Sequence, residues 1–324
     1  MKIVPVLLNP TIDQIYEIKN FYVGGTFKVE KIKIYPVGKA ISFSLGIREI
    51  SADLDNLKVL ACIGKHDINL YTKFLLERKI DFHFVEIEGK TRSNKTINDP
   101  IKNTTTHIRE KGFNLVKEDI KILKDLIHKN SEEGDIIVFS GSIPQNVSDN
   151  IYADLINLCN KRKIITVLDS SGAALTKGIK ANPTIIKPNL MELSQILDLP
   201  ELNNLDFSDL LNGCKKLVQE AKVLINDKLK IILITLGDKG ALCVSESEIF
   251  YGYVKVENPI DTVGSGDAFL AGFILNYSLG AELVKCFKNA IACGAANTLI
   301  PGPGIFQKGD MLKFLKNIKI IELY

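Results

Sequence analysis

The chain contains 324 residues, and 41 Lys+Arg against 38 Asp+Glu give it a formal net charge of +3. This near-neutral balance gives no reason to expect a nucleic acid or an acidic membrane surface as partner. Hydrophobic residues make up 46% and charged residues 24%, which excludes a disordered chain and allows a large core without disulfide or metal staples. At about 150 residues per domain, the length predicts about two domains, or one large α/β domain with an appendage.

Three features of the sequence indicate the cellular compartment of the protein: its cysteines, its histidines and the length of its apolar runs. The six cysteines are scattered without a C-x-x-C pair, which favours buried, reduced thiols over a disulfide framework. The four histidines have no zinc-ligand spacing. The N-terminal apolar stretch is too short for a signal peptide, and no segment approaches the ~20 apolar residues of a membrane span. We therefore expect a soluble, cytoplasmic protein with no membrane partner.

Along most of the chain, short apolar runs alternate with segments of helical periodicity. The apolar runs predict buried strands over residues 2–8, 57–62, 135–139, 164–168 and 230–235. Apolar residues at helical spacing predict helices over residues 117–129, 149–161, 208–225, 267–279 and 281–299. Strands that are apolar throughout are covered on both faces. The alternation therefore predicts an α/β fold, a doubly wound and mostly parallel sheet with helices on both faces.

Residues 14–36 and 89–111 have a different pattern. They lack good helices and contain alternating runs such as K-I-K-I-Y and T-T-H-I-R-E, which are typical of half-exposed antiparallel strands. Both segments interrupt the series of main-sheet elements, so we predict that they form a small β-sheet lid over its edge. The predicted α/β core then comprises residues 1–13, 37–88 and 112–324.

The strongest local signal is D-T-V-G-S-G-D-A-F, residues 261–269. Gly264, Ser265 and Gly266 precede a helix that is predicted to begin near Asp267. Small residues at a helix N-terminus can turn backbone N–H groups toward an anion. Asp267 would lie beside that anion, where its carboxylate could accept a proton from an attacking hydroxyl. A helix N-cap and a plain glycine turn explain the same residues, and the motif alone does not decide.

Other polar positions also have both a functional and a structural interpretation. Asn189 and Glu192 could orient a hydrated magnesium ion that bridges nucleotide phosphates, but N-x-x-E ahead of an apolar run is also a capping box. Asp13 follows the first predicted strand, at the edge where doubly wound sheets bind ligands, and could hold sugar hydroxyls or be a solvated turn residue. The sequence has no G-x-x-x-x-G-K-[ST] and no G-x-G-x-x-G, which disfavours P-loop chemistry and nicotinamide-dependent hydride transfer.

Taken together, a series of short motifs resembles the ribokinase-like carbohydrate kinases. The match is to the branch with the B-type phosphofructokinases, 1-phosphofructokinases and tagatose-6-phosphate kinases, and it covers nearly the whole chain in the family's order. The motifs are N-P-T-I-D (9–13), V-G-K-A-I-S (37–42), T-R-S-N (91–94), S-G-S-I-P (140–144), L-D-S-S-G-A-A-L (168–175), I-K-P-N-x-x-E (186–192), T-L-G-D-K-G-A (235–241), G-S-G-D (264–267) and A-C-G-A-A-N (292–297).

The resemblance implies a role for individual residues. Asp267 matches the catalytic base, and the loop that stabilises the transferring phosphoryl group corresponds to Gly264, Ser265 and Gly266. The nucleotide-binding positions correspond to Lys187, Asn189, Thr235, Gly237, Gly240 and Asn297, and Glu192 matches a position that holds Mg²⁺ through water. The sugar site corresponds to Asp13, Gly38 and Lys39, and the phosphate already on the substrate would be bound by Lys28 and Arg92. In this family the lid closes the site and often makes a homodimer.

The sugar half departs from the family pattern. The usual G-G-K-G-x-N reads V-G-K-A-I-S over residues 37–42, which loses two glycines and the asparagine, and Lys28 stands where arginine is common. The resemblance implies an ATP- and magnesium-dependent kinase of a ketohexose phosphate: fructose 1-phosphate, fructose 6-phosphate or tagatose 6-phosphate. Because of the altered motif, a kinase of an unphosphorylated sugar such as fructose is the first alternative. A catalytically silent sugar- or nucleotide-binding protein is the second, disfavoured by the intact G-S-G-D.

Overall fold

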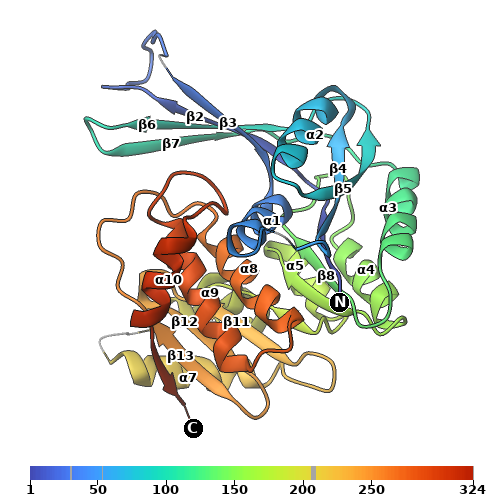
Figure 1. Ribbon diagram of the computed structural model, residues 1–324, viewed down its shortest axis with the longest axis vertical. Helices are drawn as coiled ribbons and strands as arrows, with labels where there is room; N and C mark the ends of the chain where they lie inside the picture. Colours follow the sequence, from blue (N-terminus) through green and yellow to red (C-terminus); the bar gives the residue numbers. More distant parts are fainter. Residues whose placement is uncertain (30, 53, 206–208, 324) are drawn as a thin grey trace.

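The computed structural model describes residues 1–29, 31–52, 54–205 and 209–323. Within these residues, a ten-stranded sheet with helices on both faces forms the body of the molecule, and a separate four-stranded sheet projects from one end (Figure 1). The helix predicted over residues 208–225 has its first residue outside the described part of the chain. Within the rest, α7 covers Leu210–Lys222, so the helix ends three residues earlier than predicted.

The ten-stranded sheet has the order β14-β13-β12-β11-β10-β9-β8-β1-β4-β5. Its parallel part consists of β1 (Ile3–Leu7), β4 (Lys58–Gly64), β5 (Asp81–Ile87), β8 (Ile136–Ser140), β9 (Ile165–Asp169), β10 (Ile185–Ile186) and β11 (Ile231–Thr235). Its antiparallel edge consists of β12 (Ala241–Val244), β13 (Ile249–Tyr253) and β14 (Lys319–Glu322). Every residue of β1 and β8 is buried, as their continuous apolar runs predict.

Two apolar cores lie on opposite faces of this sheet, because successive side chains of a strand point to opposite sides. Val4 and Val6 belong to one core, Ile3 and Leu7 to the other. The first core is covered by α3 (Lys117–Asn130), α4 (Ile151–Asn160), α5 (Gly172–Ile179), α6 (Leu190–Leu197) and α7 (Leu210–Lys222). The second is covered by α1 (Lys39–Ile50), α2 (Ile68–Glu77), α8 (Ser265–Ser278) and α9 (Leu283–Asn297), with α10 (Lys308–Asn317) packed on α9. The doubly wound, mostly parallel sheet is therefore confirmed.

Short 3₁₀ helices complete the described chain, at η1 (Lys65–Asp67), η2 (Pro200–Asn204) and η3 (Gly237–Lys239). All six cysteines are buried and carry free thiols. Within the described ranges, no helix combines the length and the apolar character that crossing a bilayer would require.

The four-stranded sheet, called the small sheet below, has the order β3-β2-β6-β7. Its strands are β2 (Thr11–Glu17), β3 (Ile32–Val37), β6 (Ser93–Asp99) and β7 (Thr104–Arg109). β2 with β3 and β6 with β7 are antiparallel as predicted, but the central pair, β2 with β6, is parallel. A separate small sheet is confirmed. Its action as a lid, and the division of the chain at residues 13, 36, 88 and 111, stay predictions.

Candidate active site

A cavity of about 460 Å³ opens where the parallel strands end. Residues within two positions of the ends of β1, β8, β9 and β10 line it. The last residue of β11, the start of α1, the start of α8 and part of the small sheet complete the lining. This is the edge of an open α/β sheet at which ligands bind. The residues predicted from the sequence that line the cavity are Asp13, Gly38, Lys39, Arg92, Lys187, Asn189, Glu192, Thr235, Gly264, Gly266 and Asp267.

The N-terminus of α8 forms one wall of this cavity. The helix begins at Ser265, not near Asp267 as predicted, and its N-cap is Gly264, so Asp267 lies in the first turn and is not the cap. Gly264 has a φ of 81°, and a Cβ there would lie 2.5 Å from the Pro303 Cα and the Gly304 N. Only glycine fits this position. The first turn of α8 contains Gly266 and Asp267, which line the cavity, so the N-terminal end of the helix faces it.

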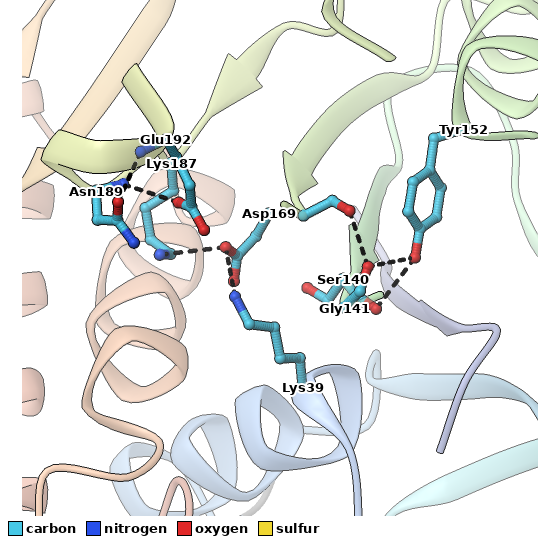
Figure 2. A network of polar contacts seen from close by, with 9 residues as sticks. Lys39, Ser140, Gly141, Tyr152, Asp169, Lys187, Asn189 and Glu192 are labelled. Carbon is cyan, nitrogen blue, oxygen red and sulfur yellow. Dashed lines mark hydrogen bonds and ion pairs between the residues drawn. The ribbon is translucent and has the colours of Figure 1, made fainter. Parts of the chain in front are cut away.

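Two lysines and a buried aspartate form an ion-pair network beside this wall (Figure 2). Asp169, the last residue of β9, is 1% exposed, and its Oδ1 lies 2.9 Å from Lys39 Nζ and 3.2 Å from Lys187 Nζ. A buried carboxylate requires such partners, because unpaired burial of a charge is strongly unfavourable. Asp169 is not among the residues predicted from the sequence, although it stands in the L-D-S-S-G-A-A-L motif. The two ion pairs of Asp169 hold both lysine side chains at the cavity wall.

The charges of this network set the protonation states around Asp267. Burial raises the pKa of Asp267 to about 7, the negative charge of Asp169 adds to this rise, and Lys39 and Lys187 oppose it. Burial by itself would raise the pKa of Asp169, but the two lysines outweigh burial and hold it below its ordinary value. Asp169 is therefore ionised at neutral pH, whereas Asp267 is close to its titration midpoint. A carboxyl with such a pKa can accept a proton at neutral pH.

Asn189 and Glu192 form the capping box that their spacing allowed. Asn189 Oδ1 accepts a hydrogen bond from the Glu192 N at 2.8 Å, and Glu192 Oε2 accepts one from the Asn189 N at 2.9 Å. Both residues also line the cavity, so the structural interpretation is correct without excluding a functional one. In the described part of the chain, no three or more His, Cys, Asp or Glu side chains form a metal cage. One carboxylate, that of Glu192, suits Mg²⁺, which keeps several waters and takes further ligands from substrate phosphates.

The opposite wall, near the small sheet, is held by hydrogen bonds around Asp13. Thr11 Oγ1 and Asn94 Nδ2 donate to Asp13 Oδ1 at 3.0 and 3.1 Å. Arg92 donates from Nε to the Pro10 carbonyl at 3.1 Å. In the altered V-G-K-A-I-S segment, Ser42 is only 2% exposed but lines the cavity. This wall therefore combines the carboxylate of Asp13, the amide of Asn94 and the guanidinium of Arg92.

Some predicted residues lie elsewhere. Lys28 is exposed in the segment between β2 and β3 and does not line the cavity, and neither do Ser265, Gly237 and Gly240. Asn297 is fully buried: its Nδ2 donates to the carbonyls of Val263 and Gly302, and its Oδ1 accepts from the Gly304 N. Its side chain therefore holds the loops around α8 and does not face the cavity. Further lining residues, to which the sequence motifs assigned no individual role, include Asn9, Thr11, Asn94, Arg109 and Ser142.

Comparison with known proteins agrees with this architecture. The model of the pfkB family carbohydrate kinases matches residues 6–308, and the chain belongs to this family. A 1-phosphofructokinase of Bacillus subtilis (strain 168) is 28% identical over 318 residues, which cover 98% of this chain and 99% of the relative. A tagatose-6-phosphate kinase of Staphylococcus epidermidis is 29% identical over 332 residues, which cover 99% of this chain and 100% of the relative.

The solved structures show the same fold. The crystal structure of phosphofructokinase-2 from Escherichia coli in complex with substrates and products has a TM-score of 0.87 and 24% sequence identity, and the match covers 98% of this chain and 99% of that one. The predicted ribokinase-like architecture and the predicted family are thus confirmed.

Proposed function

We propose that this protein transfers the γ-phosphoryl group of ATP to a hydroxyl of a ketohexose phosphate, with fructose 1-phosphate, fructose 6-phosphate and tagatose 6-phosphate as the candidates. One observation carries the proposal. A single cavity contains a carboxyl with a pKa of about 7, a helix N-terminus and two paired lysines. Family membership supports a sugar kinase, and the names of the relatives support a phosphorylated sugar.

In this proposal Asp267 accepts the proton of the attacking hydroxyl. Gly264 and Gly266 line the cavity at the start of α8, where backbone N–H groups and the helix dipole stabilise the transferring phosphoryl group. Ser265, in the same first turn, belongs to this loop through its backbone. Lys39 and Lys187 add positive charge on the same wall, in positions that Asp169 fixes. Phosphoryl transfer needs mainly such positioning and charge neutralisation.

The nucleotide phosphates would extend from this centre along the ends of β10 and β11, where Lys187, Asn189 and Thr235 line the cavity. Gly237 and Gly240 would border the nucleotide further out. Glu192 would hold a magnesium ion through water, and that ion would neutralise charge on the nucleotide phosphates. We assign Asn297 a positioning role, because its buried amide joins the Val263 carbonyl to the loop that contains Gly304.

The sugar would bind between α1 and the small sheet. Asp13 Oδ1 already accepts hydrogen bonds from Thr11 and Asn94, which aligns the carboxylate for a sugar hydroxyl, and Gly38 lines the cavity beside it. Arg92 would bind the substrate phosphate. A kinase of an unphosphorylated sugar is the second candidate. The position of Lys28 outside the cavity and the V-G-K-A-I-S segment favour it.

The small sheet would act as the lid, with residues 14–36 and 89–111 closing over the sugar and excluding water. One face of it carries exposed apolar side chains: Ile34 is 51% exposed and Ile108 49% exposed. Their register partners Gln14 and Lys95 place them on the face opposite Asp13. This face supports a homodimer through the lid. The free, buried cysteines support a reducing, cytoplasmic location.

The test of this function is an ADP-release assay with ATP and magnesium on the three ketohexose phosphates, fructose and ribose. Turnover of a ketohexose phosphate, abolished in Asp267→Asn, is the expected result. Turnover of a free sugar alone would establish the second candidate, and ATP binding without any turnover would indicate a silent binding protein.

A further inference from the structure

The small sheet presents a row of polar side chains to the cavity. The strand register places Asp13 of β2 beside Asn94 of β6, and Asn94 beside Arg109 of β7. All three residues line the cavity. Residues in such a row lie about 5 Å apart between neighbours, within reach of one shared ligand. The row therefore runs from a carboxylate through an amide to a guanidinium.

Arg109 is close to a second cavity arginine, Arg92. Burial lowers the pKa of Arg92, the negative charge of Asp13 opposes this effect, and the positive charge of Arg109 adds to it. Among the described residues, no ion pair joins either arginine to a carboxylate. Glu110, next to Arg109 in sequence, pairs instead with Lys95 at 2.6 Å and accepts a hydrogen bond from the Ser93 N. Asp13 attracts both guanidinium groups from a distance. Because neither group forms an ion pair within the described chain, the two positive charges on one cavity wall favour an anionic ligand between them.

Asn94 supplies a second, independent sign of a ligand. Its Nδ2 donates to Asp13 Oδ1, but its Oδ1 is buried and has no hydrogen-bond partner within the described chain. The residue is only 9% exposed, and an unsatisfied buried acceptor is unfavourable. A hydroxyl group of a bound molecule would satisfy this oxygen. An anion with adjacent hydroxyl groups fits both observations, and a sugar phosphate is such a molecule.

We propose that Arg109, together with Arg92, binds the phosphate group that the sugar substrate already carries, and that Asn94 accepts a hydrogen bond from a hydroxyl of the same molecule. Arg109 is then a specificity-determining residue that selects phosphorylated over free sugars. This inference rests on the proposed phosphosugar kinase function.

The test is steady-state kinetics on wild type, Arg109→Ala and Arg109→Lys, with Lys111→Ala as the control. Lys111 is exposed, carries the same charge and lies outside the cavity lining. We expect Arg109→Ala to raise KM for the ketohexose phosphate about 10- to 100-fold, the range for a lost charged hydrogen bond, with little change in KM for ATP. Arg109→Lys keeps the charge but not the planar fork, so it restores part of the affinity. Inorganic phosphate should compete with the sugar phosphate in wild type and less in Arg109→Ala.

The outcomes separate the inference from the function on which it rests. Wild-type turnover of a ketohexose phosphate with an unchanged KM in Arg109→Ala would overturn the inference and leave the function standing. Wild-type turnover of free sugars alone would overturn both. If Arg109→Ala and Arg109→Lys both raise KM for ATP and for the sugar phosphate equally, the substitutions disturb the strand and do not report on a phosphate contact. That result would also overturn the inference.

Discussion

Asp169→Asn tests the ion-pair network that organises the catalytic wall. The wild-type carboxylate is 1% exposed and lies 2.9 and 3.2 Å from two lysine nitrogens. The substitution removes the negative charge and leaves both ammonium groups facing a neutral amide. Removing one partner of a buried ion pair lowers the free energy of unfolding by about 3–5 kcal/mol. That is a large part of the total for a typical domain, about 5–15 kcal/mol. We therefore expect a clear loss of stability together with a loss of turnover.

The assay is urea unfolding, with Asp149→Asn as the matched control. Asp149 pairs with Lys177 at 3.1 Å, but the two side chains are 44% and 43% exposed. An exposed pair of this kind contributes about 0–1 kcal/mol. If Asp169→Asn and Asp149→Asn lower the free energy of unfolding by the same small amount, the network does not have the importance given to it here.

Asp169→Asn also changes the pH dependence of the reaction, in a direction that the charges fix. The negative charge of Asp169 raises the pKa of Asp267, and the two lysines lower it. Without Asp169, the remaining activity should therefore persist to lower pH than in wild type. The ionisation of the substrate phosphate cannot produce this difference, because the same substrate is used with both proteins. An acid limb that moves to higher pH would refute the reasoning.

Other predictions follow from single residues. Because Asp267 has a pKa of about 7, kcat/KM in wild type should rise about tenfold between pH 6 and pH 8 as the carboxyl loses its proton, and a flat profile would contradict a base at this position. The same raised pKa means that the folded protein binds this proton more tightly than the unfolded chain. The contribution of this proton to the free energy of unfolding is therefore lost as pH rises from about 4 to about 7. Over that range, the urea midpoint of Asp267→Asn should rise relative to the midpoint of wild type. Gly264→Ala places a Cβ 2.5 Å from Pro303 Cα and should reduce both turnover and stability; Gly280→Ala, with a similar φ of 73° but no atom within 4 Å, controls for backbone strain alone. Comparable losses in both variants would show that the close approach at Gly264 is unimportant.

Much of the fold could be predicted from the sequence because its signals are local. The continuous apolar run at 2–8 predicts a strand buried on both faces, and β1 over Ile3–Leu7 is buried throughout. The N-x-x-E spacing at Asn189 likewise predicts a capping box, which depends on only four residues. The start of α8 was placed too late, because Ser265 and Gly266 look like turn residues by composition. Packing against Pro303 and Gly304, rather than propensity, fixes the position of that helix end.

The parts of the site that were missed depend on distant contacts. Asp169 pairs with Lys39 across 130 positions of sequence, so its importance is visible only after folding. Arg109 belongs to β7, whose residues are all exposed, and only its register with Asn94 brings it to the cavity. Lys28 is exposed and lies outside the cavity lining, and its role in phosphate binding stays a prediction.

The central claim is that Asp267 is the base of a phosphoryl transfer to a sugar, and a comparison of Asp267→Asn with wild type tests it most directly. ADP release with the preferred ketohexose phosphate would be measured next to the affinity of each protein for ATP. The amide cannot accept the proton, so kcat should fall by about 10²–10⁴ while ATP affinity stays nearly unchanged. A variant that keeps nearly full turnover would contradict the assignment of Asp267 and the mechanism built on it.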